Sequence, residues 1–483
     1  MMTAIRRRIV VATADSVTPK MAGPAIRAWQ IASALSREHD VRLVTTTRCT
    51  VAQPDGFRVS AIDDRGLREA ERWCDVFIFQ GWVMASRPYL RDSEKIVVVD
   101  IYDPIHLEQL EQGRGERDAK RHRVMHAASA VLNEQLLRGD FFICASDKQR
   151  DFWLGHLATL GRVNPVTYDE DETLRSLISV VPFGISDDAP VKTRPALKGV
   201  VPGIGPDDKV ILWGGGIYNW FDPLSLIRAV DGLRRRRSDV RLFFMGLRHP
   251  NPDILEMRMA VEARRLAKQL GLAGSHVFFN EDWVAYDDRQ NFLLEADVGV
   301  STHLDHLETA YSFRTRVLDY LWASLPIVAT RGDALAELIE ERQLGLTVPP
   351  GDVDALEHAM SRLLDDDAFA ASCRENTRAV AASFAWSEVL RPLLQFCRRP
   401  RRAPDLLVPE LVSQLRGYLS VRPAEPRGVR VDVMLVRDYF RDGGLRLVLE
   451  KASGRLRRWT RRFRPDDRST RPARLDRSKP REP

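Results

Sequence analysis

Two arginines stand at the start of a predicted helix, where positive charge is unfavourable. The segment SFRTRVLDYLW begins with Ser312, a residue type that commonly caps helix N-termini, and it places Arg314 and Arg316 in the first turn. The helix dipole is positive at this end and repels cations. A strongly anionic ligand would resolve the conflict. We therefore predict that Arg314, Arg316 and the helix N-terminus together bind a diphosphate.

Asp319 lies two turns into the same predicted helix. A carboxylate at this place can accept two hydrogen bonds from the diol of a sugar. The alternative is a surface pair with Arg316, three residues earlier, which would contribute only about 0.2–0.5 kcal/mol. The order of the surrounding residues favours the sugar-binding interpretation.

A glycine run, WGGGIYNWFDP (213–223), follows another predicted strand. Glycines here let the backbone approach a ligand, and the next helix can offer its N-terminus to phosphate. We predict ligand contacts for Gly215 and Gly216, with a turn that serves only packing as the alternative. The GxGxxG pattern of dinucleotide-binding enzymes is missing, which argues against a nicotinamide-dependent dehydrogenase.

Several chemically active side chains follow the strand in VVVDIYDPIHLEQLE (97–111). Asp100 ends the strand, and Asp103, His106 and Glu108 come just after it, at the sheet edge where α/β proteins bind ligands. We predict Asp103, His106 and Glu108 as catalytic residues. The alternative is a turn aspartate and a surface histidine.

Short apolar runs alternate with helical segments along most of the chain, which favours parallel α/β sheets. Runs such as RIVVATA, VFIFQG and FFICAS are apolar on both faces, as expected for strands covered by helices on each side. The alternation pauses in a segment rich in Pro, Gly and charge, and then restarts. We predict two doubly wound domains at 1–188 and 209–382, a linker at 189–208, a crossover helix at 383–397 and a basic, partly disordered tail at 398–483.

The composition is that of an ordinary globular protein, with 483 residues, 44% hydrophobic and 29% charged. No apolar stretch reaches the roughly 18 residues of a transmembrane helix. The apolar run after the first arginines is too short for a signal peptide and predicts the first strand. The five cysteines are scattered without CxxC spacing, which predicts free thiols, no metal site and a cytoplasmic location.

The basic net charge of +6 belongs to the end of the chain. Residues 398–483 carry 24 Lys and Arg against 11 Asp and Glu, whereas residues 1–397 carry 49 against 56. A nucleic-acid partner is therefore not expected. The segment 445–463 could form a basic amphipathic helix that docks on an anionic membrane, such as the inner face of the plasma membrane. A solvated extension is the alternative and is slightly favoured.

A family resemblance covers most of residues 5–397. It is carried, in chain order, by AGPAIRAWQIASALSREHDVRLVT, SVVPFGI, VILWGGG, EADVGVS, LDYLWASLPIVATRGDALAELIEERQLGLTVPPGDVDAL and FAWSEVL. These pieces resemble the retaining, nucleotide-sugar-dependent glycosyltransferases of family four, which have the GT-B fold. The resemblance implies two Rossmann-like domains facing across a cleft. It also implies sugar transfer from a nucleotide-diphosphate donor to a hydroxyl acceptor, with retention and without metal or cofactor, in cell-surface polysaccharide or glycolipid assembly.

The resemblance also implies roles for residues near the opening segment. Family members carry a Glu, seven residues and a second Glu, and here Tyr311 and Asp319 stand at these two places. Asp319 would then bind the ribose hydroxyls. Tyr311 takes the place of the contact to the donor sugar, for which Glu308 or His306 could substitute.

Further donor contacts follow from the same resemblance. The backbone of Ser312 and Phe313 would face the donor phosphates, and Trp283 and Val284 would lie at the nucleobase edge. Gly23 matches the glycine loop near the reacting centre, with an ordinary helix entry as the alternative.

The sequence departs from relatives that clamp the diphosphate with an Arg and a Lys after the first strand of the second domain, because GGGIYNWFDP contains neither. A leaving diphosphate needs positive compensation. We expect Arg314 and Arg316 to supply it, with Arg248 as a third candidate.

Two other functions stay open. A sugar-nucleotide epimerase of the same fold would lack an acceptor site. A non-catalytic scaffold is favoured by Tyr311 in place of the usual Glu.

Overall fold

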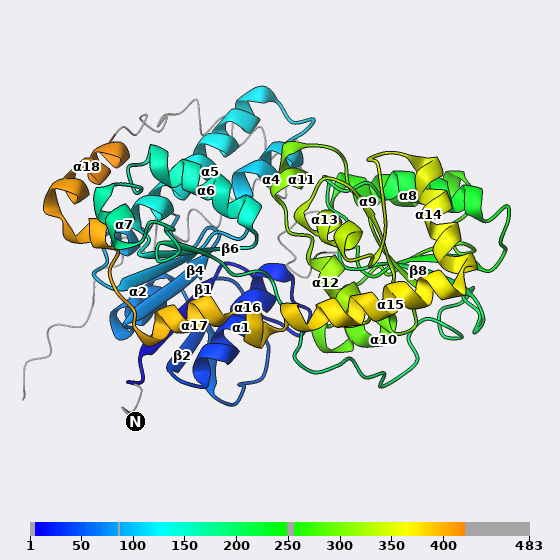
Figure 1. The fold of residues 1–483 in the computed structure, drawn as a ribbon, viewed down its shortest axis with the longest axis horizontal. Helices are drawn as coiled ribbons and strands as arrows, with labels where there is room; N and C mark the ends of the chain where they lie inside the picture. The colour runs from blue at the N-terminus through cyan, green and yellow to red at the C-terminus, as the bar shows by residue number, and fades with distance from the viewer. Residues whose placement is uncertain (1–4, 86, 248, 250–255, 421–483) are drawn as a thin grey trace, which may run out of the picture. The chain divides into compact units, whose positions relative to one another are not determined.

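The computed structural model describes residues 5–85, 87–247, 249 and 256–420, and the chain up to Leu419 forms one compact unit. Within this unit two parallel sheets are each wrapped by helices (Figure 1). The predicted α/β fold with two Rossmann-like domains is confirmed. Arg248, a candidate phosphate contact, and the segment 445–463, for which membrane docking and a solvated extension both stayed open, lie outside the described residues.

The first sheet has seven parallel strands in the order β3-β2-β1-β4-β5-β6-β7. The strands are β1 Arg8–Thr13, β2 Asp40–Thr45, β3 Phe57–Ala61, β4 Val76–Gln80, β5 Ile96–Asp100, β6 Phe141–Cys144 and β7 Ile178–Val180. Their connecting helices are α1 Gly23–Ser36, α2 Asp64–Trp73, α3 Pro88–Arg91, α4 Ile105–Gln112, α5 Asp118–Arg138, α6 Asp147–Thr159 and α7 Pro165–Glu170. We had not predicted β3, an edge strand that buries only Phe57 and Val59 and therefore lacks a continuous apolar run.

Alternate residues of this sheet pack into separate cores. On β1, Ile9 and Val11 join the core under α1, whereas Val10 and Ala12 join the core under α2, α5 and α6. Burial on both faces explains why these strands are apolar throughout.

The second sheet has six parallel strands in the order β10-β9-β8-β11-β12-β13. They are β8 Lys209–Trp213, β9 Val240–Phe244, β10 Val277–Phe279, β11 Val298–Ser301, β12 Ile327–Thr330 and β13 Gly345–Val348. The helices of this half are α8 Pro223–Leu233, α9 Arg258–Gln269, α10 Arg289–Leu293, α11 Leu307–Tyr311, α12 Thr315–Trp322, α13 Ala334–Glu341, α14 Val353–Asp365 and α15 Asp367–Ala381.

Tyr320 anchors α12 to the second sheet. Its hydroxyl accepts a hydrogen bond from Gly214 N at 2.8 Å and lies 2.8 Å from Val300 O, so it joins the ends of β8 and β11. The ring packs where a side chain on Gly299 would stand, because a Cβ there would come within 2.4 Å of it. The start of α12 is thereby fixed beside the carboxyl ends of these strands.

The chain returns to the first sheet after α15, as the yellow to orange path in Figure 1 shows. The return consists of η2 Ala382–Phe384, α16 Trp386–Val389 and α17 Arg391–Arg398. Ile185 pairs with Ala385, and the ring of Phe396 stacks on Phe141 with centroids 4.3 Å apart. The segment 383–397 therefore packs against the first half.

The linker at 189–208 is also packed. Ala196, Leu197 and Ile204 are buried, and the carboxylate of Glu295 accepts hydrogen bonds from the backbone of Ala196, Leu197 and Lys198. The side chain of one buried glutamate thus satisfies three backbone N–H groups of this irregular segment.

The beginning of the predicted basic tail is ordered and includes two helical segments. Residues 404–420 form η3 Pro404–Leu407 and α18 Pro409–Ser420. The Asp405 carboxylate lies 2.6 Å from Arg162 Nε, and both side chains are fully buried. A buried guanidinium needs such a partner, so this first part of the basic tail is ordered by a charge pair that composition does not reveal.

Candidate functional site

A cavity of about 410 Å³ opens where the carboxyl ends of both sheets contribute loops and helix starts. The first half supplies Met21, Gly23, Asp103 and Glu108 among others, and the second half supplies the glycine run and the start of α12. The predicted site residues that line it are Gly23, Asp103, Glu108, Gly215, Gly216, Trp283, Val284, Glu308, Ser312, Phe313, Arg314, Arg316 and Asp319.

His106 and Tyr311 are predicted site residues that lie outside the cavity wall. Both rings pack on Phe152, with centroid distances of 5.6 and 4.6 Å. His106 is two residues from Glu108, about 200° around helix α4, so the two side chains cannot face the same cavity. Burial lowers the pKa of His106 to about 4. We therefore do not retain His106 as a catalytic residue or Tyr311 as a donor contact.

Helix α12 begins two residues later than predicted, because its N-cap is Arg314 and not Ser312. Ser312 is the C-cap residue of α11, and both its backbone N and its Oγ donate to Thr309 O. Arg314 is the N-cap residue of α12, and Arg316 is its second residue. Ser312 lines the cavity, but its amide already donates to Thr309 O, so we do not retain this amide as a phosphate contact.

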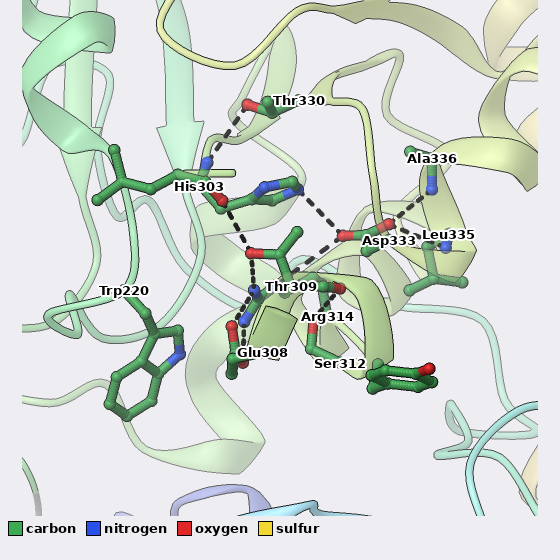
Figure 2. A network of polar contacts seen from close by, with 12 residues as sticks. Trp220, His303, Glu308, Thr309, Ser312, Arg314, Thr330, Asp333, Leu335 and Ala336 are labelled. Atoms are coloured by element: carbon green, nitrogen blue, oxygen red, sulfur yellow. Dashed lines mark hydrogen bonds and ion pairs between the residues drawn. The ribbon is translucent and has the colours of Figure 1, made fainter. Parts of the chain in front are cut away.

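Arg314 is held in a buried polar network (Figure 2). Its guanidinium donates to both oxygens of Glu308, at 2.9 and 2.7 Å, and to Thr309 Oγ1 at 3.1 Å. Arg314 Nε also lies 3.8 Å from Asp333, which is 3.3 Å from His303. With its charge balanced by two carboxylates, Arg314 is not the spare cation that we expected beside a diphosphate.

Arg316 lacks such a balance. It is 7% exposed and makes no ion pair within the described residues. One nitrogen donates to Gly216 O at 3.0 Å, and the guanidinium lies 4.1 Å from the ring centres of both Trp213 and Phe221. The other terminal nitrogen is buried with no partner among the described residues. Burial lowers the pKa of Arg316 to about 10, so the group stays charged near neutrality.

The glycine run shapes the wall next to Arg316. Gly215 has φ +74°, a left-handed conformation that favours glycine. A Cβ on Gly216 would come within 2.9 Å of the Trp283 ring. Gly216 is therefore required by the close approach of Trp283, a packing reason of the kind that we had held as the alternative.

Trp283 joins the two halves at the far side of the cavity. Its Nε1 donates to Met21 O at 3.2 Å, and its backbone pairs with Gly246. Val284 follows it on the cavity wall, two residues before Tyr286. An apolar, aromatic edge is present where the resemblance implied a nucleobase.

Asp319 was predicted either to bind a sugar diol or to pair with Arg316 on the surface, and its observed contacts match neither alternative in full. It lines the cavity and pairs with Arg289, whose Nε lies 3.0 Å from Asp319 Oδ1. Nothing in the residue order indicates Arg289, which is 30 residues away and stands at the start of the short helix α10. No periodic pattern links residues of such separation.

Asp103 and Glu108 form a carboxyl pair on the wall of the first half. They share a side-chain hydrogen bond, in which protonated Glu108 donates to Asp103. Burial and the nearby charge of Glu308 raise the pKa of Asp103 to about 7, and burial followed by repulsion from Asp103 raises that of Glu108 further. Asp100 is elsewhere, paired with buried Arg27 at 2.6 Å. The cavity thus places a proton-accepting pair opposite a buried cation.

Replacing Glu108 with glutamine should stabilise the protein more at pH 8 than at pH 5. The native state keeps the proton of a carboxyl whose pKa is raised, whereas the unfolded chain releases it above about pH 4. The free energy of unfolding therefore falls with rising pH, by at most about 1.4 kcal/mol per pH unit. Melting temperatures of Glu108→Gln at both pH values test this, with exposed Glu69→Gln as the control. An equal shift at both pH values would contradict it.

The described residues hold no group of three or more His, Cys, Asp or Glu side chains with the geometry of a metal site. All five cysteines are unpaired, as predicted. None of the described helices combines the length and apolar character that a membrane crossing requires.

Comparisons with known proteins bear on both halves. Residues 208–366 match the family described as Glycosyl transferases group 1. No curated protein matches the sequence.

Solved structures resemble nearly the whole described unit. A sucrose-phosphate synthase from Thermosynechococcus elongatus has a TM-score of 0.58 and 16% identity, covering 82% of this chain and 99% of its own. WaaG, a glycosyltransferase involved in lipopolysaccharide biosynthesis, has a TM-score of 0.56 and 17% identity, and the match covers 79% of this chain and 99% of WaaG. HepE from Anabaena, solved in complex with UDP-glucose, has a TM-score of 0.54 and 14% identity, and the match covers 81% of this chain and 99% of HepE. At these identities the likeness establishes the fold, which is the GT-B fold expected from the sequence.

Proposed function

We propose that this chain, whose residues 208–366 belong to the glycosyl transferases group 1 family, moves a sugar from a nucleotide-diphosphate donor to an acceptor hydroxyl. The observation that carries the proposal is Arg316, a buried and unbalanced cation on the cavity wall beside the glycine run. Burying a charge without a partner costs free energy, and a bound diphosphate would supply the anionic partner that Arg316 lacks.

The donor would lie mainly on the second half. Its diphosphate would meet Arg316 and the start of α12, and its ribose would meet Asp319 one helical turn further on. The base would pack near Trp283 and Val284, where the wall is apolar. Phe313 and Gly215 complete the donor side.

The acceptor would lie mainly on the first half, near Gly23 and the carboxyl pair. In the transfer step the acceptor oxygen bonds to the anomeric carbon on the face from which the diphosphate leaves, while the bond from that carbon to the phosphate oxygen breaks. The electron pair leaves with the diphosphate, whose charge Arg316 stabilises. The acceptor proton passes to Asp103, whose raised pKa suits a general base near neutral pH.

Finer features of the proposal rest on the resemblance in sequence. They are retention at the anomeric carbon, independence from metal, and a cytoplasmic enzyme that works on cell-surface polysaccharide or glycolipid. WaaG is described as involved in lipopolysaccharide biosynthesis, which supports that setting. Association with an anionic membrane through 445–463 belongs to the same proposal.

The first test is a thermal-shift screen of the full chain against nucleoside diphosphates and their sugars. Uridine compounds come first, because HepE was solved with UDP-glucose. A ligand at 100 times its dissociation constant adds about 2.7 kcal/mol to the free energy of unfolding. We expect one nucleotide series to stabilise the protein, and the same series then serves as donor in an acceptor screen.

Product analysis separates the competing functions. A transferase releases nucleoside diphosphate and forms a glycoside with the acceptor. An epimerase changes the sugar while it stays on the nucleotide, and a scaffold binds the donor without turnover. No thermal shift with any nucleotide would overturn the proposal.

A further inference from the structure

Arg289 is a buried cation for which no motif of the sequence provides a role. It is 7% exposed and stands at the first position of α10. Its guanidinium lies between two aromatic rings, 3.7 Å from the centre of Tyr286 and 4.3 Å from that of Trp322. One terminal nitrogen donates to Tyr286 O at 2.6 Å. These contacts fix the plane of the guanidinium, so its remaining donors point in a fixed direction.

The fixed guanidinium holds one oxygen of Asp319. Arg289 Nε donates to Asp319 Oδ1 at 3.0 Å, and this is a single bond, not a fork. In the described part of the chain Oδ2 accepts no hydrogen bond, and the Asp319 side chain is 31% exposed on the cavity wall. Glu308 on the same wall differs, because Arg314 binds both of its oxygens. Asp319 therefore has one side-chain oxygen available to a ligand.

The place of Asp319 fits one part of a nucleotide. It follows Arg316 by three residues on α12, about one turn or 5 Å along the helix axis. Both residues line the same cavity. In a nucleoside diphosphate the ribose that carries the hydroxyls is bonded directly to the diphosphate. One ligand can therefore contact both side chains.

We propose that Arg289 is a positioning residue that selects a ribonucleotide donor, by holding Asp319 so that Oδ2 faces the ribose diol. This inference rests on the proposed function. Arg289 lines the same cavity and donates its Nε hydrogen to Asp319, so its effect on the ribose diol passes through the direction of the carboxylate. Without Arg289 the carboxylate can turn toward water and loses its preference for the diol.

The experiment measures the dissociation constant of a deoxynucleotide divided by that of the matching ribonucleotide. A general loss of stability does not change this ratio. The probes are UDP, 2′-deoxy-UDP and 3′-deoxy-UDP, or the matching three compounds for whichever nucleoside diphosphate the full chain binds. A hydrogen bond to a charged group is worth about 1.5–3 kcal/mol, so at least one deoxy compound should bind the wild type tenfold or more weakly. Isothermal titration gives each dissociation constant.

In Arg289→Ala the ratio should fall at least fivefold toward one. Asp319→Asn should lower it likewise, and the double variant should lower it no further. Arg289→Lys keeps the charge without the flat fork and should restore part of the ratio. The matched control is Arg241→Ala, which breaks another largely buried Arg–Asp pair, with Asp208 at 3.0 Å, away from the cavity wall.

Each failure has its own signature. A wild type that binds no nucleoside diphosphate overturns both the proposed function and this inference. Normal binding with a ratio near one, or a ratio unchanged in Arg289→Ala, overturns the inference alone. If Arg289→Ala does not fold, Arg289→Lys and Asp319→Asn supply the same comparison of ratios.

Discussion

Replacing Arg316 with methionine should strongly weaken nucleoside diphosphate binding and, at the same time, raise the melting temperature of the free protein. The guanidinium is buried between Trp213 and Phe221 without a carboxylate partner in the described residues. A methionine keeps the aromatic contacts and removes the cost of the unpaired charge. Gly216 O would still accept a hydrogen bond from Trp213 Nε1, so it is not left unsatisfied.

The loss of binding should be large. A bound diphosphate would accept charge-assisted hydrogen bonds from Arg316, each worth about 1.5–3 kcal/mol. We expect an affinity at least 100-fold weaker, measured by titration of the nucleotide that the wild type prefers. An affinity of Arg316→Met close to that of the wild type would contradict the assignment of the diphosphate to this residue.

Arg314→Met is the matched control, two residues earlier in the chain. Arg314 is paired with Glu308, so its removal leaves a buried carboxylate without its partner (Figure 2). Breaking a buried pair in this way costs about 3–5 kcal/mol. The two arginine variants should therefore shift the melting temperature in opposite directions, which a general sensitivity of the region could not produce.

Asp103→Asn should lower the turnover number about 10²–10⁴-fold and leave donor affinity nearly unchanged. These are the usual limits for the loss of a general base. Asparagine keeps the size of the side chain and its hydrogen bonding to Glu108, but it cannot accept a proton. Turnover is followed as transfer to the acceptor found in the screen, or as slow hydrolysis of the donor.

The pH profile adds an independent check. Because burial and Glu308 raise the pKa of Asp103 to about 7, its basic form grows between pH 6 and 8, and wild-type turnover should rise over that range. In Asp103→Asn this rise should disappear. Turnover that keeps the same rise in the variant would show that another group accepts the proton.

The parallel sheets could be predicted from the sequence because their signal is local. Strands such as β4 and β6 are apolar throughout since both faces are covered, and that pattern survives in the residue order alone. The positions of Asp103 and Glu108 could be predicted for a related reason. They follow β5 directly, and the carboxyl ends of parallel strands share one edge of the sheet.

Only the tertiary structure decided which charges are free. Arg314 and Arg316 look equivalent in the sequence, yet one is paired with Glu308 and the other is not. Arg289 and Asp319 are 30 residues apart, and Arg162 and Asp405 are 243 apart, with no pattern that joins them. Helix and strand periodicity follows from local backbone geometry, whereas a buried charge finds its partner only when distant segments pack together, because only there does the loss of water make pairing necessary.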